Sequence, residues 1–208
     1  MKNNHKDLIT ALVDDLEPVH KPAGFVMAFQ LWLVMAVLSA GGLAWFTGPY
    51  RDGALGQLTS SLQFSIETII GCVAILGVAF IPAGQTVFQQ RTLPLILLFI
   101  WGTCYVYGIV DPALAESMAG KRDHCYFETM LLAVLPLLVG LFWAKGLWPT
   151  NKTQTGLLFG LAAGAIGAMV MQFACMYEPK HALLFHVLPG LLMGVVGVFL
   201  AHVMIKLD

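Results

Sequence analysis

Charged residues are scarce in this chain. Only 11% of its 208 residues are charged, whereas 58% are hydrophobic. The mean hydropathy is +0.79, and a water-soluble globule of this size cannot bury so much apolar surface, so lipid is the expected solvent. The formal net charge is −1, and no basic stripe with interleaved aromatic residues is present. Direct binding to nucleic acid is therefore not expected.

The sequence also lacks the common motifs of enzymes. It contains no CxxC pair, no HExxH motif, no phosphate-cradling glycine loop and no arrangement of Ser, His and Asp that predicts a nucleophile. A membrane enzyme such as a thiol oxidoreductase is therefore disfavoured. We expect the protein not to be an enzyme.

Long apolar runs dominate what is present. Each is close to the ~20 residues that a helix needs to cross the hydrocarbon layer, and backbone groups in lipid must be satisfied within the segment, which favours helices. The runs cover residues 24–46, 60–83, 92–111, 125–148, 154–177 and 182–205. The expected fold class is all-α: a polytopic membrane bundle of six transmembrane helices over residues 23–208, preceded by a leader, residues 1–22.

The distribution of positive charge predicts the orientation. If the N-terminus lies inside, most of the 11 lysine and arginine residues fall on the cytoplasmic side. Both termini are then cytoplasmic, and the connections after the first, third and fifth spans face the exterior.

Small residues recur in the last two runs. Every fourth position is glycine at Gly156, Gly160 and Gly164 and again at Gly190 and Gly194. Such stripes allow two helix backbones to approach closely, so we expect these two spans to pack together. Pro136 and Pro189 lie inside runs, where each removes a backbone donor and is expected to kink its helix.

The leader has the pattern of an amphipathic helix that ends at Pro18. Its apolar residues at helical spacing are Leu8, Ile9, Leu12, Val13 and Leu16, and its acidic residues are Asp7, Asp14 and Asp15. Such a stripe lies on a membrane or docks in a groove of a partner. Anionic headgroups would repel the acids, which favours a protein partner.

Candidate ligands and thiols gather at the predicted outer boundary. Cys125 opens the fourth span and Cys175 closes the fifth, so both thiols lie at similar depth. Within about one turn of this boundary are also His124, Glu128, His181 and His186. A disulfide fits an exterior compartment, and thiolate with imidazole also suits a soft metal such as zinc or cadmium. The spacing does not decide between these two states, and two unrelated small residues at helix ends would give the same pattern; no cofactor is required.

A buried acid is expected near the same group. Glu67 lies within the second apolar run, where a carboxyl group must face the bundle, pair or stay protonated. It is expected to support the outer group, near Cys125, His186 or Glu128. Cys72 and Cys104 lie among apolar neighbours and are expected to serve packing.

Two segments carry a family resemblance. The leader, with Asp7-Leu8-Ile9-Thr10-Ala11-Leu12, then Asp15-Leu16-Glu17-Pro18-Val19 and Lys21-Pro22, resembles the opening of the bacterial negative-regulator-of-sigma-F family, six-helix membrane anti-sigma factors. Cys125 and Cys175, on either side of a glycine-rich fifth run, are similar to that family's pair of periplasmic cysteines. The stretch Met176-Tyr177-Glu178-Pro179 departs from the commoner Cys-Pro form.

The resemblance implies a regulatory function in the bacterial inner membrane. The cytoplasmic leader would hold an extracytoplasmic-function sigma factor away from RNA polymerase, since its acids suit a basic partner surface. A stress signal outside, metal or oxidative, would act at Cys125 and Cys175 and release the sigma factor. The alternative class is a small transporter or permease for a metal ion or solute that uses Glu67 and the outer Cys and His residues, although no inverted repeat is evident.

Overall fold

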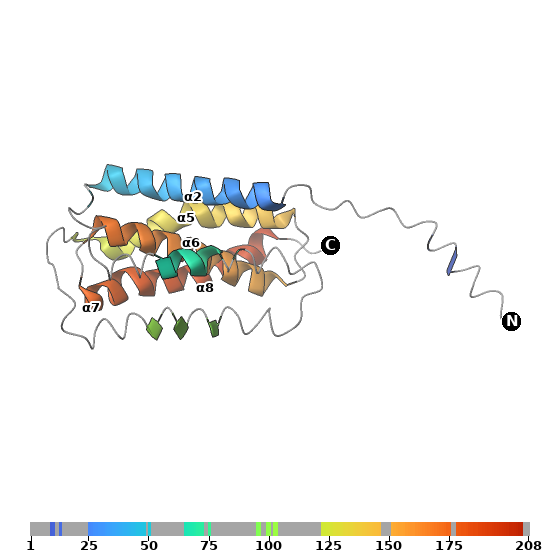
Figure 1. The fold of residues 1–208 in the computed structure, drawn as a ribbon. Coiled ribbons are helices and arrows are strands. Elements are labelled where there is room, and N and C mark those ends of the chain that lie inside the picture. The colour runs from blue at the N-terminus through green and yellow to red at the C-terminus, as the bar shows by residue number, and fades with distance from the viewer. Residues whose placement is uncertain are drawn as a thin grey trace.

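Regular structure in the described part of the chain is entirely helical. The computed structural model describes residues 9–10, 13, 25–48, 50, 65–72, 75, 95–96, 99–100, 102–103, 122–146, 151–175 and 178–205. The helices are α2 (Phe25–Thr47), α5 (Cys125–Lys145), α6 (Lys152–Ala174), α7 (Pro179–Ala182), the π-helix η3 (Leu183–Val187) and α8 (Leu188–Met204). Because α7, η3 and α8 follow one another without a break, they form one continuous helical segment (Figure 1).

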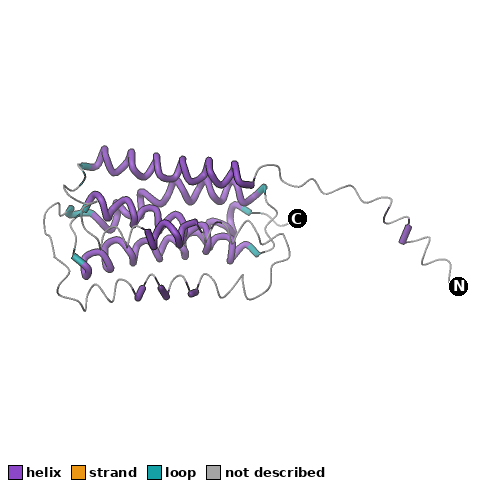
Figure 2. The backbone as a smooth tube through the Cα atoms, viewed as in Figure 1, coloured by secondary structure: helices purple, strands orange, loops and turns teal. Residues whose placement is uncertain are grey.

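Four of these helical segments are long and apolar enough to cross a membrane. They cover Phe29–Thr47, Cys125–Lys145, Lys152–Ala174 and Lys180–Met204. They match the first, fourth, fifth and sixth expected spans, which confirms the all-helical class. The expected spans at 60–83 and 92–111 lie largely outside the described residues, although every described residue within them is helical (Figure 2).

Side chains on the outer faces of these helices are apolar. Phe46 is 88% exposed, Phe127 is 72% exposed and Phe142 is 75% exposed. Water would make such a surface unstable in a monomer, whereas lipid tails solvate it well. The exposed faces therefore agree with the membrane environment that the composition predicts.

The helix boundaries differ from the expected ones by a few residues, and local capping explains one of them. The side chain of Asn151 accepts a hydrogen bond of 3.0 Å from the backbone N–H of Gln154, so α6 begins at Lys152 rather than at 154. Helix α6 ends at Ala174 rather than at 177, and α5 ends at Lys145 rather than at 148.

The helices alternate in direction. In Figure 1, one end of the bundle holds the C-terminal ends of α2 and α6, the start of α5 and the short helix α7. The opposite end holds the starts of α2 and α6 and the C-terminal end of α8. Helix α6 is central, because 89% of its apolar stretch is buried inside the bundle, whereas the corresponding share is 22–44% in the other three spans. Its neighbours include α2, α5 and α8.

Close packing of α6 against α8 confirms the prediction from the glycine repeats. A Cβ added at Gly160 would lie 2.7 Å from the Cα of Gly194, and one at Gly164 would lie 2.9 Å from the Cα of Gly190. Only hydrogen fits at these positions, so the two backbones touch directly.

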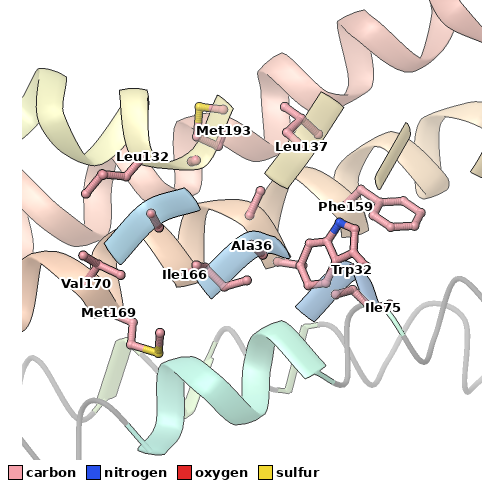
Figure 3. Close-up of a cluster of buried hydrophobic side chains, with 14 of the residues drawn as sticks. Trp32, Ala36, Ile75, Leu132, Leu137, Phe159, Ile166, Met169, Val170 and Met193 are labelled. Carbon is pink, nitrogen blue, oxygen red and sulfur yellow. The ribbon is translucent and has the colours of Figure 1, made fainter. Parts of the chain in front are cut away.

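A core of buried side chains connects the remaining helices to α6. Trp32 of α2 packs edge-to-face on Phe159 of α6 with ring centroids 6.4 Å apart, and Figure 3 shows the two rings with Leu137 of α5 in the same cluster. Thr68, on the helical segment 65–72, donates a hydrogen bond of 3.0 Å to the sulfur of Met169 of α6. This segment therefore lies against the central helix too.

Candidate functional site

Cys125 and Cys175 face each other at the end of the bundle where α6 ends. Cys125 is the first residue of α5, and Cys175 follows the last residue of α6. Their exposed fractions are 1% and 0%. The two sulfur atoms lie 2.7 Å apart, and neither belongs to a disulfide. The topology predicts a shared depth for these thiols, and the structure brings them into direct contact.

Two histidines from the last helical segment lie against this pair. The Nε2 atom of His181 is 3.4 Å from the sulfur of Cys175. The ligand atoms of Cys125, Cys175, His181 and His186 all lie within 4.8 Å of one another, and all four residues are buried. We call these four residues the Cys₂His₂ cluster.

The π-helix η3 determines how the two histidines are oriented. Residues five apart on an α-helix of 3.6 residues per turn point about 140° away from each other. A π-turn has more residues per turn and a hydrogen bond between residues five apart, so it rotates such a pair toward one face. In η3, the N–H of Leu188 bonds to the carbonyl of Leu183. The rings of His181 and His186 consequently approach to 5.3 Å between centroids.

Pro189 and Thr129 explain why the π-turn forms here. Proline has no N–H, so Pro189 cannot donate to the carbonyl of Phe185, four residues earlier. The hydroxyl of Thr129 on α5 lies 3.1 Å from that carbonyl oxygen and 2.8 Å from the carbonyl oxygen of Cys125. The single hydroxyl hydrogen is shared between these two carbonyls, so a side chain of another helix compensates in part for the missing backbone donor, one turn below Cys125.

Arg122 connects the cluster to helix α2. Its Nε donates a hydrogen bond of 3.0 Å to the carbonyl of Ala174, and its Nη1 donates one of 2.9 Å to the hydroxyl of Thr47, the last residue of α2. The same Nη1 lies 3.2 Å from a carboxylate oxygen of Glu128. The carbonyl of Arg122 is itself 3.2 Å from the sulfur of Cys125. One side chain therefore holds three helix ends beside the thiols.

The surroundings of Cys175 favour its thiolate form. The hydrogen bond with Cys125 lowers the pKa of the Cys175 thiol, burial raises it, and the neighbouring imidazoles of His181 and His186 lower it again. The net effect is a pKa well below the ordinary value of a thiol. Thiolate is the form that attacks oxidants and binds metals, so these surroundings favour the reactive form within the pair.

Of the described residues that were predicted for the site, the others are not members of the cluster. His124 precedes Cys125 but is exposed, and the carboxylate of Glu128 pairs with Arg122. Glu67 is fully buried on the segment 65–72. Cys72 is half-buried on the same segment, and Cys104 lies outside the described residues.

Little of the leader is included in the described part of the chain. Ile9 and Val13 are helical there, with exposed fractions of 59% and 57%, so these two apolar side chains are available to a partner. The other candidate partner-binding residues lie outside the described residues: Asp7, Leu8, Leu12, Asp15, Leu16 and Pro18.

Sequence reasoning missed Arg122 and Thr129. Both had a signal: Arg122 is a cation three residues before Cys125, and Thr129 follows Cys125 by one helical turn, on the same face. Neither spacing reveals the partner on another helix, since those contacts depend on how α2 and η3 pack against α5.

The cluster is compatible with two chemical states. Oxidation of Cys125 and Cys175 would join them in a disulfide, whereas the two sulfurs with the two imidazole nitrogens form a ligand set typical of a soft metal ion.

Comparison with known proteins identifies the family. Neither the curated proteins nor the solved structures contain a match to this chain. A family model described as negative regulator of sigma F does match, over residues 12–206. Because this match covers nearly the whole chain, from the leader to the end of the last helix, the protein belongs to the negative regulator of sigma F family.

Proposed function

We propose that this protein is an inner-membrane anti-sigma factor. It holds an extracytoplasmic-function sigma factor with its cytoplasmic leader, residues 1–22, and releases it when a periplasmic stress alters Cys125 and Cys175. Membership of the family supports negative regulation of a sigma factor. The observation that carries the sensory part is the 2.7 Å contact between the two buried sulfurs, in which a change of thiol state requires the atoms to move.

The leader is suited to capturing a protein. Ile9 and Val13 expose their apolar side chains, and a partner groove would bury them. The acidic residues beside them attract a basic surface, which a sigma factor needs for DNA binding. Sequestration in this way keeps the sigma factor at the membrane.

The contacts of Arg122 supply a route from the thiols to the leader. Movement of Cys125 would displace Arg122, because the sulfur of Cys125 contacts the carbonyl of Arg122. The guanidinium group of Arg122 in turn holds Thr47, the last residue of α2. Helix α2 runs along the length of the bundle and begins at Phe25, shortly after the leader. A shift or rotation of α2 would therefore reposition the leader on the opposite side of the membrane.

A pull-down from the native membrane tests capture. The intact chain is compared with a variant that lacks residues 1–22, and the bound proteins are identified. We expect a sigma factor with the intact chain only. Recovery of no leader-dependent sigma factor would contradict the proposed capture.

A reporter strain tests release. A promoter that depends on the captured sigma factor is followed after oxidant or heavy-metal stress, in the native strain and in a strain with Cys125→Ser and Cys175→Ser. We expect the double variant to lose induction, while Cys72→Ser, a thiol away from the cluster, responds normally. Normal induction in the double variant would exclude the two cysteines as the sensor.

A membrane carrier for a metal ion is the second candidate. The buried carboxyl group of Glu67 within an apolar helical segment favours it, because such groups mark ion pathways in other membrane proteins. Uptake of zinc by vesicles that contain the purified protein tests this candidate. Uptake that Glu67→Gln abolishes would support it, and vesicles no more permeable than empty ones would exclude it.

A further inference from the structure

We propose that the Cys₂His₂ cluster is a binding site for Zn²⁺ or a similar soft divalent cation, and that metal binding and the Cys125–Cys175 disulfide exclude each other. This inference deepens the function proposed above and rests on it for its regulatory meaning. The metal site itself depends only on the four side chains.

One distance in the cluster matches that of a tetrahedral zinc site, and a second would have to increase. Zinc lies about 2.3 Å from a thiolate sulfur and about 2.0–2.1 Å from an imidazole nitrogen, so tetrahedral geometry requires S···N of about 3.5 Å and S···S of about 3.8 Å. The sulfur of Cys175 and Nε2 of His181 are 3.4 Å apart. The two sulfurs, at 2.7 Å, need to separate by about 1 Å.

The chemistry of the ligand set selects the cation. The group contains two thiols and two imidazoles and no carboxylate, which disfavours Mg²⁺ and Ca²⁺ and favours Zn²⁺, Cd²⁺ and similar ions. Two thiolates neutralise a divalent charge, so a closed site carries no net charge. Neutrality matters here because Cys125, Cys175 and His186 are at most 1% exposed, and a buried net charge is costly.

The last helical segment presents its histidines as a preformed pair. His181 and His186 are separated by four residues, within the H-x₃₋₅-H spacing of structural zinc sites. The ring of His181 stacks on Phe185 with centroids 4.7 Å apart and an interplanar angle of 19°. This stacking restricts rotation of the imidazole before metal binds.

The same two sulfurs cannot serve both states. A disulfide needs an S–S distance of about 2.05 Å, whereas the metal site needs about 3.8 Å. With hydrogen peroxide as the oxidant, the two zinc-bound thiolates lose two electrons and form one S–S bond. The peroxide takes up these electrons and two protons to give two water molecules, and Zn²⁺ leaves because only two histidine ligands remain. Oxidation is therefore expected to eject the metal.

Metal analysis of the purified full-length protein tests the site. The chain is reduced, loaded with Zn²⁺ in detergent micelles, freed from excess metal and measured by elemental analysis, and Co²⁺ is used in parallel for its absorption spectrum. We expect one metal ion per chain and a tetrahedral Co²⁺ spectrum with thiolate charge transfer. Peroxide is expected to release the metal in step with the loss of titratable thiols. Clearly less than one ion per chain, or metal retained after complete disulfide formation, would overturn the proposal.

Matched variants assign the ligands. His181→Gln with His186→Gln removes two ligands and is expected to weaken zinc binding by about 100-fold or more, while the cysteines still form a disulfide. His124→Gln changes an exposed histidine next to Cys125 and serves as the control with native affinity. Native affinity in the double histidine variant would contradict the ligand assignment. If that variant does not fold, the loss of metal on oxidation of the native chain still decides whether the two thiols hold the metal.

Metal binding and sigma-factor capture can fail independently. If the chain binds zinc but captures no sigma factor, the metal site is supported and the regulatory function is contradicted. If the chain captures a sigma factor but binds no metal, the function is supported and the metal site is contradicted.

Discussion

The indole N–H of Trp32 donates a hydrogen bond of 2.9 Å to the carbonyl of Pro136. The two residues are 104 positions apart in the chain, and the bond is buried between α2 and α5. Gly140 makes room for it, because a Cβ at that position would lie 2.9 Å from the indole nitrogen. A helix that begins next to the leader is thus fixed beside Pro136 as well as at its C-terminal end, where Arg122 holds Thr47.

Replacing Trp32 with Phe should loosen α2. The ring is retained in part, but the hydrogen bond to Pro136 is lost, which costs about 1 kcal/mol of the free energy of unfolding. Unfolding in mixed detergent micelles measures the change. Trp45→Phe is the control, since Trp45 is 68% exposed and should show no comparable loss. Equal effects of the two substitutions would argue against the buried bond.

Substitution of Gly160 by Ala should separate α6 from α8. The new methyl group would lie 2.7 Å from the Cα of Gly194, so the backbones must move apart, at about 1–3 kcal/mol. Gly42→Ala provides a matched control, because nothing lies within 4 Å of its added Cβ. Loss of stability should appear in the Gly160 variant alone when both are unfolded under the same conditions.

Thr129→Val should weaken the π-turn that orients the histidines. Valine has the shape of threonine and no hydroxyl, so the carbonyl of Phe185 loses the donor that replaces the missing N–H of Pro189. This bond is only partly buried, so its loss is expected to cost about 1 kcal/mol. We expect lower stability together with weaker zinc binding, both measured on the purified chain. Thr129→Ser keeps the hydroxyl and should preserve both properties; if serine behaves like valine, the hydroxyl is not the cause.

Arg122→Gln should uncouple the thiols from α2. Glutamine cannot reach Ala174, Thr47 and Glu128 together, so the change at Cys125 would no longer reach the leader-bearing helix. We expect a reporter strain with this variant to lose stress induction although the two cysteines still oxidise, as thiol labelling would show. Lys180→Gln removes an exposed cation near the same end of the bundle and should respond normally. Normal induction with Arg122→Gln would exclude this route.

Helical periodicity and composition were sufficient to predict much of the architecture. Apolar runs of spanning length can satisfy their backbone only as helices in lipid, and four of them were found at their expected places. The repeats around Gly160 and Gly194 predicted close packing of α6 and α8 because only small residues permit backbone contact. The alternation of span direction was enough to place Cys125 and Cys175 at one end of the bundle.

What the sequence determined is therefore the class of the protein, its long helices and the end at which the thiols lie, since these depend on local hydropathy and on the number of crossings. The tertiary structure decided which of the neighbouring polar residues join the thiols. His181 and His186 do so because Pro189 and the hydroxyl of Thr129 stabilise a π-turn that rotates both rings inward, whereas exposed His124 does not. Such rotations depend on a hydrogen bond between helices that are distant in the chain. The sequence around the histidines does not show which residue of another helix forms that bond.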